Sequence, residues 1–186
     1  MRIFLIVAVM VLLAGPWVAP ASGQAPTSQA PADKARRGAK DQKFISKAAE
    51  GDLAEIELGK LAAEKASSDG VKQLGQRLAQ DHSRANDELT QLAQQKGVAL
   101  PTALDRKHTA LRDRLAKLSG AEFDRAYLTE MNRDHREDIA EFEREAQKGG
   151  DPDVKSWAAK TLPTLREHLE LVQKLRAQAG SGTKAR

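Results

Sequence analysis

Apolar side chains recur at helical spacing along most of the chain. From Lys43 onwards, apolar positions repeat every three or four residues, which is the period of helices that each bury one face. Glycine, proline and N-capping residues interrupt this pattern near residues 67–70, 97–101, 119–122 and 149–152. The pattern therefore predicts four long helices, with short turns after the first and the third.

The connection between the second and third long helices is much longer, at roughly 23 residues. An apolar stripe from Leu104 to Leu118 predicts a further helix within it, with Thr102 as the N-cap. A connection of this length can run the full height of a bundle, so the second and third helices can be parallel. We therefore predict an all-α fold, a ferritin-like four-helix bundle with a short crossover helix between helices 2 and 3.

Residues 1–23 have the pattern of a secretory signal peptide. Arg2 precedes an apolar run, and the small residues Ala19, Ala21 and Gly23 offer cleavage sites. The run has about 12 residues, whereas a membrane-spanning helix needs roughly 20. We predict cleavage of this segment, export to the periplasm, and no transmembrane span in the mature protein.

The rest of the chain divides into a domain and two ends. Residues 24–42 are rich in Ala, Pro, Gln, Ser and Lys without periodicity, which predicts a flexible linker. A bundle domain over 43–178 and a disordered tail over 179–186 complete the predicted organisation. Basic residues outnumber acidic ones in both ends, so weak contact with an anionic envelope surface is expected there. The domain itself is nearly neutral, which argues against a nucleic-acid partner, and the oligomeric state is left open.

Composition limits the chemistry that the domain can perform. There is no cysteine, which excludes disulfides, cysteine-based zinc and iron–sulfur sites, thiol catalysis and a lipoprotein anchor. The sequence has no HExxH motif, glycine-rich phosphate loop or nucleophile elbow, so a binding or structural protein is favoured over an enzyme. Any metal would have to be held by nitrogen and oxygen ligands.

All four histidines lie on the apolar stripes of the predicted helices. His82, His135 and His168, together with Glu55, each lie roughly 12–16 residues into a long helix, so they reach mid-height whichever way the helices run. Their side chains can therefore converge in one layer of the core. His108 lies on the crossover helix and cannot be placed in this way, so its role is left open.

Two interpretations of this cluster remain open. Neutral imidazoles with the carboxylate of Glu55 suit a transition metal such as Zn, Cu or Fe, in a protein that protects the cell envelope under stress. Alternatively, Glu55 accepts hydrogen bonds from the imidazoles in a buried polar network that fixes helix register in a structural or interaction bundle. Ring nitrogens of His82, His135 and His168 within roughly 5 Å of a common point would favour the metal.

Several segments, in order along the chain, resemble a bacterial family. These are residues 53–59 (LAEIELG), 81–83 (DHS), 96–101 (KGVALP), 123–127 (FDRAY), 134–135 (DH) and 161–165 (TLPTL). They resemble the exported ferritin-like domains of unknown function that are often labelled outer membrane proteins. The resemblance implies a ferritin-like bundle in the cell envelope without an established activity.

The di-iron chemistry of ferritin-like proteins does not carry over with this resemblance. Those centres use a Glu three residues before a His on two of the helices. Here Ala79, Asn132 and Leu165 stand three residues before His82, His135 and His168. A site for one metal ion, or no metal site, therefore fits the sequence better than a ferroxidase centre.

Overall fold

The computed structural model describes residues 29–182, and helices account for most of them. In chain order these are α1 (Gln29–Lys65), α2 (Asp69–Lys96), α3 (Arg106–Ala116), α4 (Gly120–Lys148) and α5 (Pro152–Gly182). The prediction of an all-α helical bundle is confirmed. No helix in the described part of the chain is both long enough and apolar enough to cross a membrane.

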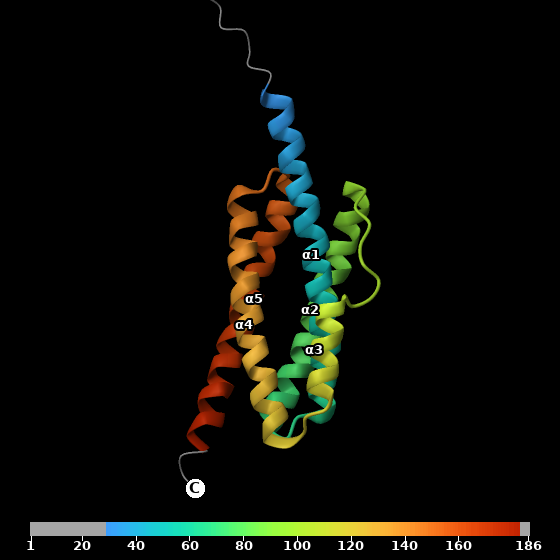
Figure 1. The fold of residues 1–186 in the computed structure, drawn as a ribbon. Helices are drawn as coiled ribbons and strands as arrows, with labels where there is room; N and C mark the ends of the chain where they lie inside the picture. The colour runs from blue at the N-terminus through green and yellow to red at the C-terminus, as the bar shows by residue number, and fades with distance from the viewer. Residues whose placement is uncertain (1–28, 183–186) are drawn as a thin grey trace, which may run out of the picture.

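The helices form two antiparallel hairpins joined by one long connection (Figure 1). α1 packs along α2, and α4 packs along α5. α2 and α4 run in the same direction, because the chain returns along the bundle through α3, which packs mainly on α1. The predicted crossover with its short helix is therefore present.

Capping side chains begin most helices at the positions that the sequence predicts. The Ser68 side chain accepts a hydrogen bond from the backbone N–H of Val71 and caps α2. Asp151 accepts from the backbone N–H groups of Asp153 and Val154 at the start of α5. The crossover helix is shorter than predicted, because the side chain that caps it is Asp105 rather than Thr102.

The ends of the domain differ from the predicted boundaries. α1 begins at Gln29, inside the segment predicted to be a linker, and α5 continues to Gly182. The segment 29–42 is rich in good helix formers, and its proline lies in the first turn, where the ring displaces no helical hydrogen bond. Asp41 also anchors it, since its carboxylate accepts from the backbone N–H groups of Gly150 and Asp151, at 3.0 and 2.8 Å. The predicted signal peptide and residues 183–186 of the predicted tail lie outside the described residues.

A layer of polar side chains divides the apolar core into two parts. One apolar cluster is built around Leu58, Leu78 and Tyr127, and the other around Ile45, Leu89 and Trp157. Between them lie five buried polar residues: Asp52, Glu55, His82, His135 and His168. The mid-height convergence expected from the sequence is thus present, and it brings more acidic groups than the sequence suggested.

Candidate metal centre

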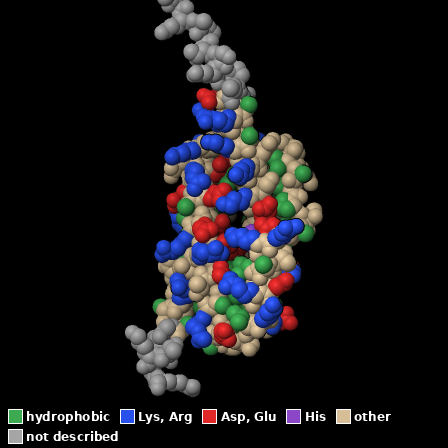
Figure 2. Space-filling model, in the orientation of Figure 1, with side chains coloured by type: hydrophobic (Ala, Val, Ile, Leu, Met, Phe, Trp, Pro, Cys, Tyr) green, Lys and Arg blue, Asp and Glu red, His purple; other side chains and the backbone are tan. Residues whose placement is uncertain are grey.

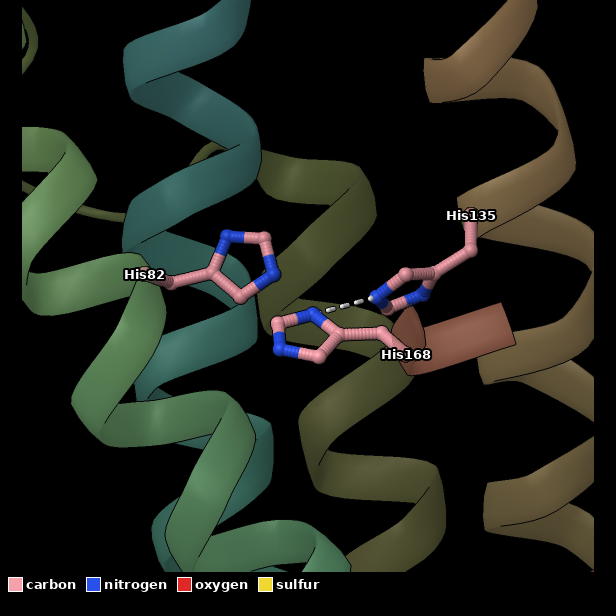
Figure 3. A group of neighbouring side chains, drawn as sticks. All are labelled: His82, His135 and His168. Atoms are coloured by element: carbon pink, nitrogen blue, oxygen red, sulfur yellow. Dashed lines mark hydrogen bonds between the residues drawn. The ribbon is translucent and has the colours of Figure 1, made fainter. Parts of the chain in front are cut away.

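Three histidines from three helices meet in the centre of the bundle. His82 of α2, His135 of α4 and His168 of α5 are 4%, 0% and 1% exposed. One ring nitrogen from each lies within 4.8 Å of the others. Figure 3 shows the three rings pointing toward one another, with Nε2 of His135 3.3 Å from Nδ1 of His168. The three nitrogens therefore meet the expectation that they lie within roughly 5 Å of a common point.

The outer ring nitrogens of the three histidines all contact hydrogen-bond acceptors. Nδ1 of His82 lies 2.8 Å from the carboxylate of Asp52, and Nε2 of His168 lies 2.8 Å from that of Asp81. Nδ1 of His135 lies 3.0 Å from the backbone carbonyl of Met131. A carbonyl or an ionised carboxylate can only accept, so these contacts place a proton on each outer nitrogen. In metal sites, the same kind of contact fixes the tautomer and the ring orientation of a histidine ligand.

The inner nitrogens consequently present lone pairs to one another when the rings are neutral. The 3.3 Å contact between His135 and His168 can be a hydrogen bond only if one of its nitrogens gains a proton. Nε2 of His82 is buried and has no hydrogen-bond partner in the described structure. A cation between the three nitrogens would stabilise such an arrangement.

The three histidines differ in pKa because their electrostatic surroundings differ. Burial lowers the pKa of His135 to about 3, and the positive charges of His82 and His168 lower it further. Burial also lowers the pKa of His168 to about 4, although Asp81 opposes this shift. Burial acts in the same direction on His82, but the hydrogen bond and charge of Asp52, with the charge of Glu55, outweigh it and raise the pKa to about 9. In the metal-free protein at neutral pH, His135 and His168 are therefore neutral, and His82 alone carries a second ring proton and a positive charge.

Glu55 lies beside the three nitrogens rather than among them. Its side chain is fully buried, and Oε1 is 3.8 Å from the outer nitrogen Nδ1 of His135. Neither carboxylate oxygen has a hydrogen-bond partner. Burial raises the pKa of Glu55 well above its usual value, and the charges of Asp134 and Asp138 on α4 add to this. Its role as a metal ligand remains a prediction.

The fourth histidine is separate from this cluster. His108 lies in the first turn of α3, and its Nδ1 is 3.1 Å from the carboxylate of Asp105, which caps the same helix. It therefore does not belong to the group of three nitrogens.

The sequence analysis did not identify the two acidic residues that orient the rings, Asp52 and Asp81. Asp52 lies one helical turn before Glu55 on α1, and this shared face is the signal that could have identified it. Asp81 precedes His82 in the chain, yet its carboxylate contacts His168 on another helix. Glu167, the acidic neighbour of His168, instead pairs with Arg77 at the surface.

Comparison with known proteins supports the fold and gives a family. A DUF305 fragment from Deinococcus radiodurans is similar over 74% of this chain and 95% of its own, with a TM-score of 0.66 and 14% identity. A candidate secreted DUF305 protein from Streptomyces coelicolor is similar over 75% and 93%, with a TM-score of 0.64 and 14% identity. No curated protein matches the sequence. A domain family of unknown function, DUF4142, matches residues 24–175, and the chain belongs to this family.

Proposed function

We propose that this domain binds one transition-metal ion in its core through His82, His135 and His168. The observation that carries the proposal is the convergence of three buried ring nitrogens whose opposite nitrogens all contact acceptors. This arrangement fixes the inner nitrogens as metal-ligating lone pairs. The carboxylate of Asp52, 2.8 Å from the outer nitrogen of His82, is negative charge beside the site and favours a cation.

The alternative is a structural network without metal, and the contact between His135 and His168 favours it. A network that stabilises a core must satisfy its buried polar atoms. This cluster leaves four such atoms without a partner: Nε2 of His82, both oxygens of Glu55 and Oδ2 of Asp52. Metal binding accounts for the free nitrogen of His82, whereas a closed network does not.

The three imidazole nitrogens favour transition metals over calcium and magnesium. Neutral imidazoles suit divalent zinc, copper, iron and nickel, whereas calcium and magnesium prefer oxygen ligands. No thiolate is available, because the chain contains no cysteine. We therefore expect a divalent ion of the first transition series, with Zn²⁺ as the convenient probe.

Urea unfolding with and without Zn²⁺ tests the proposal. An ion that binds only the folded state stabilises it by RT ln(1 + [L]/Kd), which is about 2.7 kcal/mol at a hundredfold excess over Kd. We expect this gain for the wild type, its removal by a chelator, and its absence in His135→Gln. His108→Gln is the matched control and should keep the gain.

A metal-free network predicts a different set of results. Zn²⁺ and chelator would then leave the unfolding curve unchanged, and His135→Gln would cost roughly 1–3 kcal/mol by stranding its partners. That outcome would replace the metal site by the structural interpretation.

The proposed setting is the cell envelope. An exported location is supported by the signal-peptide pattern of residues 1–23 and by the description of the similar Streptomyces coelicolor protein as a candidate secreted protein. A bundle that sequesters a transition metal there would protect against metal stress. Detection of the mature protein in a periplasmic extract, with a mass that lacks the first 23 residues, would test the location.

A further inference from the structure

A cavity of about 360 Å³ lies between α1, the start of α3 and α4. Acidic side chains outnumber basic ones in its lining, which includes Glu50, Asp105, Asp134, Glu137 and Asp138, against three lysines. One of these, Lys47, is already paired with Glu141. Figure 2 shows the face of the molecule on which α1, α3 and α4 lie foremost, with acidic and basic side chains gathered around its middle.

Two acidic residues in the lining of this cavity belong to the stretch of α4 that carries His135. Asp134 and Asp138 lie one turn apart on α4, on either side of His135 in the sequence. Next to them is Glu55, whose pKa they raise and whose Oε1 is 3.8 Å from His135. Carboxylates therefore line the cavity, and a further carboxylate lies beside His135. Both oxygens of Glu55 are buried without a hydrogen-bond partner, so a cation that reached them would supply the missing interaction.

A second cavity, between α2 and α5, is less suited to admit a cation. It is smaller, at about 150 Å³, and its acidic residues Asp81 and Glu88 are matched by Arg84 and Lys160. Asp81 is already bound by Arg77, Arg84 and His168. A positive ion approaching from this side would meet side chains whose charge is already neutralised.

We propose that the cavity between α1, α3 and α4 is the entrance for a divalent metal ion. In this proposal, Asp138 and Asp134 draw the ion from solvent, and Glu55 passes it to the histidines. The proposal rests on the metal site described above and assigns its route of loading. Clefts lined by one sign of charge raise the association rate of an oppositely charged ligand by about 10- to 1,000-fold, and salt weakens this effect.

Stopped-flow mixing of the metal-free protein with Co²⁺ measures the loading rate through the visible absorption of the bound ion. We expect Asp138→Asn to slow loading about tenfold at low salt, with the same final amount of bound Co²⁺. Lys107→Glu replaces a positive by a negative charge at an exposed position of the cavity lining, so it should accelerate loading. Glu143→Gln removes the same charge from α4 where the side chain pairs with Arg166, so it should leave the rate unchanged.

The rate and the final amount of bound Co²⁺ separate the two proposals. Unchanged rates in Asp138→Asn and Lys107→Glu, with slower loading in Glu88→Gln, would overturn this entrance and favour the cavity between α2 and α5. A wild-type protein that binds no Co²⁺ would overturn the metal site and the entrance together. A variant that loads more slowly but reaches full occupancy would support both.

Discussion

A single carboxylate fixes the orientation and tautomer of each of two histidine rings. Asp52 contacts the outer nitrogen of His82, and Asp81 contacts that of His168. These contacts keep the proton on the outer side of each ring and leave the inner nitrogen free for a metal. Each of these two histidines is therefore oriented by a carboxylate from another helix.

Replacing Asp52 by Asn should weaken metal binding while leaving the three histidines in place. Loss of a carboxylate that orients a histidine ligand typically costs 10- to 100-fold in metal affinity, and we expect a loss in that range. Calorimetric titration with Zn²⁺ measures it. Asp87→Asn removes the same charge from an exposed position of α2 and should leave the affinity unchanged. Equal affinities in the two variants would argue against the orienting role of Asp52.

Glu145 gives the stability of the domain a pH dependence that does not involve the metal centre. Burial, together with the charge and a hydrogen bond of Asp41, raises the pKa of Glu145 to about 7 from its usual 4.5. The folded state therefore binds this proton more tightly than the unfolded state, and stability is lost as pH rises from about 4.5 to about 7. Glu145→Gln should remove this loss.

Thermal unfolding at pH 5 and pH 8 checks this prediction. The stability of Glu145→Gln minus that of the wild type should be larger at pH 8 than at pH 5. Glu143→Gln, at an exposed site two residues earlier, serves as the control and should show no such change. A difference between wild type and Glu145→Gln that is the same at both pH values would contradict the assignment.

Sequence periodicity predicts where residues lie along a helix better than which residues they meet. The rise of a helix is fixed, so the sequence places His82, His135 and His168 at one height. The pairing of Asp81 with His168 depends on how the helices are rotated about their axes, and no local pattern encodes that rotation. The same limit explains why Glu55 lies beside the outer edge of His135 instead of among the inner nitrogens.

At the scale of elements, two glycines allow α1 and α2 to approach closely. A Cβ atom at Gly59 would lie 2.5 Å from the backbone oxygen of Gly75, and one at Gly75 would lie 2.6 Å from that of Gly59. Backbone atoms on both sides leave no flexible group that could move aside. This contact holds the first hairpin together below the histidine layer, next to the buried Leu58 and Leu78.

Gly59→Ala should therefore destabilise the domain. Overpacking in a core typically costs about 1–3 kcal/mol, and the contact with backbone favours the upper part of this range. Gly38→Ala, also on α1, has no atom within 4 Å of the added Cβ and should stabilise the helix by up to about 1 kcal/mol. Urea unfolding of both variants measures the difference, and similar effects of the two substitutions would show that the glycine contact does not limit packing.

Element boundaries were predictable where a cap or a glycine marks them and not where composition alone was used. Ser68 and Asp151 mark the starts of α2 and α5 in the sequence and in the structure. The segment 29–42 lacks an apolar stripe, so it resembled a linker. It is helical because its residues favour a helix and because Asp41 is bound to the turn between α4 and α5.

In the whole molecule, the three-histidine cluster lies where the two hairpins meet. His82 belongs to the hairpin of α1 and α2, whereas His135 and His168 belong to that of α4 and α5. The polar layer separates two apolar clusters, so the hairpins are joined at mid-height by polar groups rather than by a continuous apolar core. An ion bound to all three histidines would link the hairpins at this level.

Native mass spectrometry of the protein after loading with Zn²⁺ and removal of free metal tests the central claim most directly. We predict one Zn²⁺ ion per chain for the wild type and for His108→Gln, and no ion for His135→Gln, since two imidazoles leave the site incomplete. A wild-type protein that retains no metal, or a His135→Gln variant that retains as much Zn²⁺ as the wild type, would contradict the account.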